Sequence, residues 1–172
     1  MQMVKRIVGG FFLLILLMWI FAPKHELYYL LEKELKKKDI IISNETVSDT
    51  WFGLNIKNAD IYVKGIKMAN TAEFQLNMFF FYNTLNIENI NMDKSLHAMA
   101  PKAIDELKVK YTVLNPLNVT IDALGSFGTA AGTVALKEKQ VHIDFPVAKD
   151  IQTIKKFLKK DKTGGWYYET NY

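Results

Sequence analysis

Residues 72–82 read AEFQLNMFFFY and contain the longest alternation of apolar and polar residues in the chain. The apolar positions of this alternation are Ala72, Phe74, Leu76 and Met78. Because successive side chains of a strand point to opposite faces, the pattern predicts a strand with one apolar face. Four consecutive aromatic residues, Phe79 to Tyr82, close the stretch and cannot all lie on that face. Helices of the domain, a partner or lipid must cover some of them.

Shorter alternations flank this stretch on both sides and predict further strands. They occupy 54–63, 85–92, 109–113, 117–123 and 141–145, and residues 40–42 predict a short strand before them. Turn signals such as Gly65 and Asn115-Pro116 separate them, and the segment 166–172 is aromatic enough for a terminal strand. The predicted core of the fold is therefore an antiparallel β-meander with one apolar face.

Amphipathic helices are expected to cover this sheet. Residues 24–38, KHELYYLLEKELKKK, carry leucine at every fourth position and end in lysines, as a helix dipole favours. A second helix is predicted over 151–160, and residues 96–107 predict a helix or turn whose regular part is 102–107. The expected fold class is α+β, an N-terminal transmembrane helix followed by an antiparallel β-meander sheet domain covered by two or three amphipathic helices.

The N-terminal run from Ile7 to Ala22 predicts a membrane span. It is uncharged, follows Lys5-Arg6 and precedes Pro23, and as a helix it is roughly 24 Å long. A cleaved signal peptide would end in small residues, which are missing here, and a buried core helix would show a polar stripe. The expected organisation is a cytoplasmic stub and anchor over 1–22 and one sheet domain over 23–172. The anchor residues are Ile7, Phe11, Leu14, Trp19 and Phe21.

The orientation of this span is not decided by charge alone, because lysines follow it as well as precede it. The chain contains no cysteine, which is consistent with an oxidising compartment. We therefore expect a single-pass protein of the inner membrane with its C-terminal domain in the periplasm.

No catalytic or metal-binding constellation is present in the sequence. The three histidines are not at metal-ligand spacing, and His142 with Asp144 predicts a surface hydrogen bond on one strand face. Residues 125–132 are rich in glycine but lack the ending of a phosphate loop, so they predict a tight turn, a bulge or close strand approach. The net charge of +4 comes mainly from lysines without interleaved arginine and aromatic residues. We expect no enzyme activity, no cofactor, no metal and no nucleic-acid partner.

Four motifs carry a family resemblance: P-K-x-E-L-Y-Y-L-L-E at 23–32, A-D-I-Y-V-K-G at 59–65, G-S-F-G-T-A-A-G-T-V-A-L at 125–136 and G-G-W-Y-Y-E at 164–169. With the short anchor before them, they resemble the protein N family of type II secretion systems. The resemblance implies a bitopic, non-enzymatic periplasmic component. That family is similar in turn to larger groove-forming envelope proteins that handle lipid, and small relatives could serve other envelope machines, including the scaffold around a flagellar motor.

Two functions are open from the sequence. The first is a structural or adaptor component of a large envelope machine, with the membrane and other protein subunits as partners. The alternative is a protein that binds or transfers lipid or another hydrophobic ligand. The candidate partner or lipid surface consists of Phe74, Leu76, Met78, Phe80, Trp166, Tyr167 and Tyr168.

The predicted topology can be measured directly. A reporter that is active only outside the cytoplasm, fused after Tyr172, should be active, because Lys5-Arg6 precede the apolar run. The mature protein should also keep residues 1–22, since the run lacks a cleavage site. N-terminal sequencing that starts near Pro23 would contradict the anchor.

Overall fold

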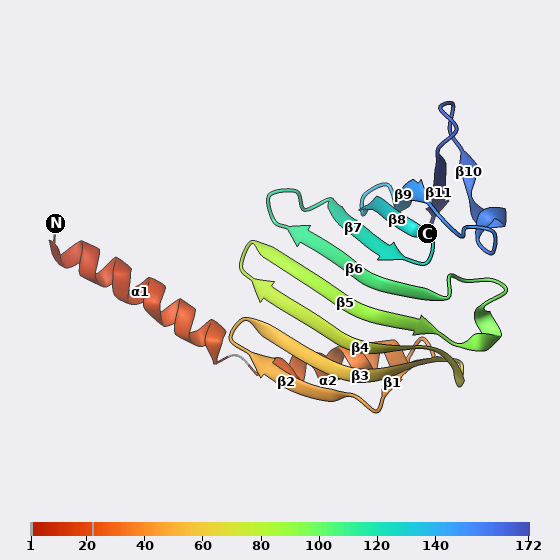
Figure 1. Cartoon of the computed structure of the whole chain (residues 1–172). Helices are drawn as coiled ribbons and strands as arrows, with labels where there is room; N and C mark the ends of the chain where they lie inside the picture. The colour runs from red at the N-terminus through yellow and green to blue at the C-terminus, as the bar shows by residue number, and fades with distance from the viewer. Residues whose placement is uncertain (1, 22) are drawn as a thin grey trace.

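Figure 1 shows the computed structural model of the chain, which describes residues 2–21 and 23–172, and the side chains of all of these except Met3, Trp19 and Leu27. Two α-helices lead into one antiparallel sheet, so the predicted α+β class with an antiparallel meander is confirmed. The helices are α1 (Gln2–Ile20), α2 (Lys24–Lys36) and the single 3-10 turns η1 (Lys94–Leu96) and η2 (Lys155–Phe157). The strands are β1 (Ile40–Ser43), β2 (Thr46–Thr50), β3 (Gly53–Val63), β4 (Ile66–Phe79), β5 (Tyr82–Met92), β6 (Ala103–Thr112), β7 (Asn118–Gly125), β8 (Gly128–Ala135), β9 (Gln140–Ala148), β10 (Lys159–Lys160) and β11 (Trp166–Asn171).

In the described part of the chain these eleven strands form one sheet in the order β1-β3-β4-β5-β6-β7-β8-β9-β11-β10. β2 pairs with β3 beside β1, so β1 and β2 lie end to end along the same edge. Asn44 lies at the junction between them with a φ of 63°. Its amide donates to Asp60 at 2.9 Å, and Lys67 of β4 contacts the same carboxylate at 2.7 Å. These contacts hold the pKa of Asp60 below its usual range and join three strands.

Two helical predictions are wrong. Residues 102–107, expected to be helical, lie largely in β6, because that segment pairs with β5 on one side and β7 on the other. The helix expected over 151–160 is only the turn η2, because Lys159 and Lys160 extend and pair with β11. In both cases the ladder hydrogen bonds to neighbouring strands outweigh the local helical pattern.

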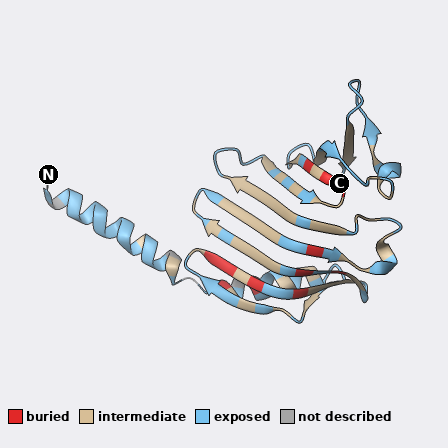
Figure 2. Ribbon diagram, viewed as in Figure 1, coloured by how far each residue is buried: buried red, intermediate tan, exposed pale blue. Residues whose placement is uncertain are grey.

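α2 confirms the helix predicted over 24–38 and covers one end of the sheet, where it contacts β1, β2 and β3. Tyr28, Leu54 and Ile56 are each only 2% exposed and form a small core with Ala59. Figure 2 shows the most extensive buried surface on β3. The Tyr28 hydroxyl donates to Glu45 at 3.0 Å, and burial together with this hydrogen bond raises the pKa of Tyr28. The helix α2 therefore covers mainly the first strands of the sheet.

α1 projects away from the sheet, and its surface is exposed almost throughout (Figures 1 and 2). The predicted anchor residues Ile7, Phe11, Leu14 and Phe21 are between 55% and 80% exposed. The side chain of Trp19 and the whole of Ala22 lie outside the described residues. Among the residues that the structure describes, no helix is both long enough and apolar enough to cross a membrane.

Shortening the best-buried core residue tests the packing under α2. Leu54→Ala should lower the free energy of unfolding by about 2–5 kcal/mol, because the methyl groups leave a cavity that the surrounding ladders cannot fill. Lys57→Ala is the matched control, since Lys57 is exposed on the same strand. Denaturant unfolding of both variants measures the difference, and equal midpoints would show that α2 does not seal a core.

Candidate functional site

The strand register aligns one residue from each of eight neighbouring strands in a single row across the sheet. From β3 to β11 the row consists of Leu54, Leu76, Leu85, Val109, Ile121, Gly132, Ile143 and Tyr168. A second row runs beside it through Ile56, Phe74, Ile87, Leu107, Ala123 and Ala130. We call the side of the sheet that carries both rows the apolar face. Neither row contains a charged residue.

The opposite side of the sheet is polar. Its central row consists of Asn55, Gln75, Asn86, Lys108, Asp122, Ala131, Asp144 and Tyr167. Lys108 pairs with Glu106 at 2.5 Å and Lys110 pairs with Asp122 at 3.1 Å. These charges also line an open hollow of about 410 Å³, where each lysine has a carboxylate beside it. The polar side is therefore a solvated surface on which Lys108 and Lys110 are paired with carboxylates.

The predicted contact between His142 and Asp144 is confirmed on this polar side. His142 Nε2 lies 3.2 Å from Asp144 Oδ1, Glu169 lies 3.8 Å from the other ring nitrogen, and Tyr167 stacks on the ring at 5.3 Å. All of these groups lie at the surface rather than in a cleft. The arrangement is a surface network of polar contacts.

The two ends of the apolar face are covered differently. At the β3 end, α2 closes over a wholly apolar space of about 70 Å³ between Tyr28 and the row residues Ile56, Phe74 and Ile87. At the β11 end, the connection from β9 to β11 borders a hollow of about 360 Å³. This second hollow is lined by Ile143, Phe145, Ile154, Phe157, Leu158 and Tyr168. Because Ile143 and Tyr168 belong to the first row, both spaces lie on the same face.

The middle of the apolar face lacks such cover. Leu85, Val109 and Ile121 lie on interior strands and yet remain half-buried. The contacts of α2 concentrate on β1 to β3, and the segment expected to form a second covering helix is the turn η2 at the β11 end. The first row is therefore only partly covered at Leu85, Val109 and Ile121, although Ile90 of β5 and Ala130 of β8 beside it are buried.

The sequence-predicted surface residues separate into three groups. Phe74 and Leu76 lie in the two rows, and Met78 follows on the same side of β4. Phe80 lies in the turn between β4 and β5. On β11, Trp166 and Tyr168 pair with Phe145 and Ile143 on the apolar face, whereas Tyr167 points to the polar side.

The candidate surface predicted from the sequence did not include the residues in the middle of the two rows. Val109, Ile121 and Ile143 were recognised as strand residues, but alternation alone does not show whether a strand face is covered. The small amount of helix became visible only in the structure, because the sequence predicted further helices over 102–107 and 151–160. An eight-strand apolar row needs more than one 13-residue helix to cover it.

The glycine-rich stretch has the structural role predicted for it. Gly128 has a φ of 96° beside the tight turn between β7 and β8, and the register shifts between Thr129 and Ala131. Gly132 lies in the first row, where a Cβ atom would lie 2.8 Å from Cγ1 of Ile143. The glycine therefore leaves room for the neighbouring isoleucine.

Within the described residues, no three His, Cys, Asp or Glu side chains gather as a metal site. The absence of a cofactor and of catalysis remains a prediction. Comparisons of the chain with protein-family models, with curated proteins and with solved structures find no match.

Gly132 provides a test of the row itself. Gly132→Val should lower the free energy of unfolding by about 1–3 kcal/mol, because its side chain must displace Ile143 and press on the β9 backbone. Ala131→Val is the control, since residue 131 is exposed on the polar side and strands accept β-branched residues. Thermal unfolding compares the two, and a neutral Gly132→Val would contradict the described register.

Proposed function

We propose that this protein is a membrane-anchored, non-enzymatic protein that binds lipid acyl chains on the apolar face of its sheet. The observation that carries the proposal is the half-buried row through Leu85, Val109 and Ile121 on interior strands. From the sequence, the adaptor function came first because two helices were expected to cover the sheet. The second of these helices is only the turn η2. We therefore favour binding of a hydrophobic ligand over the adaptor function.

The chemistry of the rows favours a chain-like apolar ligand. Seven inter-strand spacings give the first row a length of roughly 34 Å, longer than the acyl region of one membrane leaflet. Each methylene that leaves water on such a surface contributes about 0.8 kcal/mol. Because the rows contain no charge, they offer nothing to a headgroup, and selectivity for the acyl chain is expected.

The properties of α1 support lipid as the occupant. Most of its described apolar side chains are exposed, and such a helix would be stable only in an apolar environment. The helix is about 28 Å long, slightly less than a bilayer core, and local thinning and snorkelling of Lys5 and Arg6 accommodate such a difference. We propose a single-pass inner-membrane protein with residues 23–172 in the periplasm. The resemblance to the type II secretion protein N family is in keeping with this arrangement.

A second candidate is the structural or adaptor component of an envelope machine, such as a secretion system or a flagellar motor scaffold. It is favoured by β2, whose one described pairing is with β3, so that its outer side is open to a strand of another subunit. Trp166, which pairs with Phe145 on the apolar face, is an aromatic contact point for such a partner.

Photo-crosslinking of the full-length protein in its membrane tests the acyl-chain site. A benzophenone amino acid replaces Val109 or Ile121 in the middle of the first row, in cells grown with labelled phosphate. The matched controls carry the same group at Lys110 or Thr120, the next position along each strand and on the polar side. Illumination should yield phospholipid adducts at Val109 and Ile121 only.

The type of adduct separates the two functions. Adducts with a protein at the Val109 and Ile121 positions, without phospholipid, would favour the adaptor. Equal phospholipid labelling at all four positions would show contact with bulk membrane and no selective face. Phospholipid at the row positions alone supports lipid binding.

A further inference from the structure

In the described part of the chain four hairpin tips lie on one edge of the sheet, and the last of them, 136–139 between β8 and β9, contains Lys137, Glu138 and Lys139. The other three tips carry no charged residue. They are 51–52 between β2 and β3, 80–81 between β4 and β5, and 113–117 between β6 and β7, and we call them the uncharged rim. Figure 1 shows this edge as the one nearest to α1. Trp51 is 73% exposed, Phe81 65% and Leu114 92%. Side chains of this size are normally buried, so a continuous exposed set marks a contact surface.

Contacts between the tips join them into one surface. Met78 donates its backbone N–H to the carbonyl of Phe52 at 2.7 Å, and Val113 donates to the carbonyl of Phe81 at 3.1 Å. The rings of Phe52 and Phe79 meet edge to face at 5.3 Å. The tips therefore present their apolar side chains from a fixed backbone frame.

The junction of α1 and α2 is held beside this rim. Lys24 is only 5% exposed, and its ammonium donates to the carbonyl of Ile20 at 3.0 Å and to that of Thr50 at 2.9 Å. His25 lies 2.8 Å from Asp49. Since Thr50 directly precedes Trp51, the end of the apolar helix and the first tip are linked through one buried cation.

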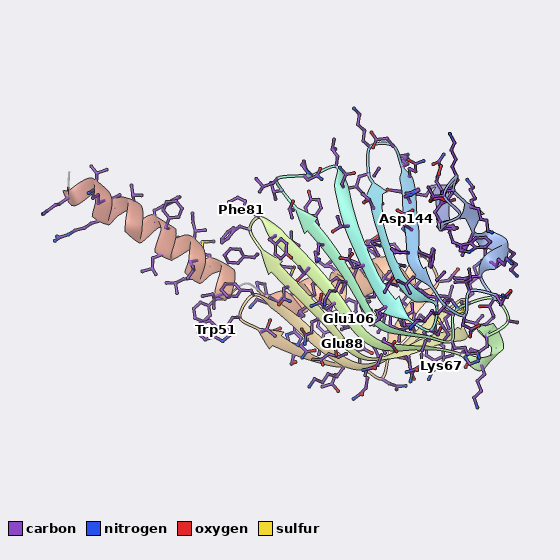
Figure 3. All side chains as sticks on the ribbon, turned by 45° about the horizontal axis from the view of Figure 1, so that its top comes forward. Trp51, Lys67, Phe81, Glu88, Glu106 and Asp144 are labelled. Carbon is purple, nitrogen blue, oxygen red and sulfur yellow. The ribbon has the colours of Figure 1, made fainter. Side chains whose placement is uncertain are left out.

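The opposite edge of the sheet is chemically different. Its connections between strands are Lys64-Gly65, the segment 93–102, the short uncharged turn 126–127 and the lysine-rich segment 149–165. Figure 3 places Trp51 and Phe81 at the end of the sheet next to α1, and Lys67 at the far end. The uncharged rim thus lies at the end of the sheet next to α1, whereas most of the connections at the other end carry lysines.

We propose that the uncharged rim docks into the boundary between headgroups and acyl chains of the membrane that holds α1. Trp and Phe favour that depth, and an uncharged rim lets the apolar face open onto lipid without crossing a charged barrier. The lysines of the opposite edge then face the aqueous phase. This inference rests on the proposed function, which supplies lipid as the ligand. It goes further by naming the surface through which lipid would reach the two rows.

A fluorescent probe in full-length protein tests the docking. Because the chain has no cysteine, Leu114→Cys and Phe81→Cys each accept a single nitrobenzoxadiazole label, and Lys64→Cys supplies the control on the opposite edge. The labelled proteins are reconstituted into vesicles of phosphatidylethanolamine and phosphatidylglycerol, with or without lipids spin-labelled near the headgroup. Labels at 114 and 81 should show blue-shifted emission and lose fluorescence to the spin label, whereas the label at 64 should show neither.

Rim labels that behave like the label at Lys64 overturn the proposal. A blue shift without quenching by the spin-labelled lipid also overturns it, and indicates that a protein surface covers the rim. The lipid-binding function can fail independently of the docking. If the rim labels are quenched but Val109 forms no phospholipid adduct, the docking is supported and the proposed ligand is contradicted. If Val109 forms phospholipid adducts but the rim labels are not quenched, the proposed ligand is supported and the docking is contradicted.

Discussion

The cross-strand register is the constraint on which the rest of the structure depends. Each strand from β3 to β8 pairs with the next along the chain, and the pairing keeps Leu76, Leu85, Val109 and Ile121 directly opposite one another. A shift of one residue between any two strands would place apolar side chains among the lysines of the other face. The apolar face and the polar face therefore exist only together, as two consequences of one alignment.

Burial is uneven across this aligned sheet. Tyr28, Leu54, Ile56 and Ala59 form a closed core under α2, whereas the same row further along the sheet is half-buried. The middle strands are joined by backbone hydrogen bonds, but no helix of the described chain packs on their apolar side chains as α2 does on β3. A bound acyl chain would supply the missing apolar contact, and a ligand that binds only the folded state also stabilises it.

The uncharged rim and the apolar face belong to the same strands, and their chemistry matches. Phe81 and Leu114 lie at the ends of strands whose interior positions carry Leu85, Leu107 and Val109. The buried Lys24 ties the end of α1 to this edge through two backbone carbonyls. The uncharged rim, the apolar face and the lysine-rich segment 149–165 thus occupy different parts of a single sheet.

The sequence by itself determined the strands with clear alternation and the orientation of their side chains, because alternation over 72–78 and 117–123 is a local property of period two. The helix α2 and the turn at Gly125–Gly132 were predicted for similar local reasons. What only the tertiary structure decided was the state of 102–107 and 151–160, whose helical patterns yield to pairing with β5, β7 and β11. It also decided which part of the apolar face stays open, since cover depends on how far one helix reaches across strands that are distant in sequence.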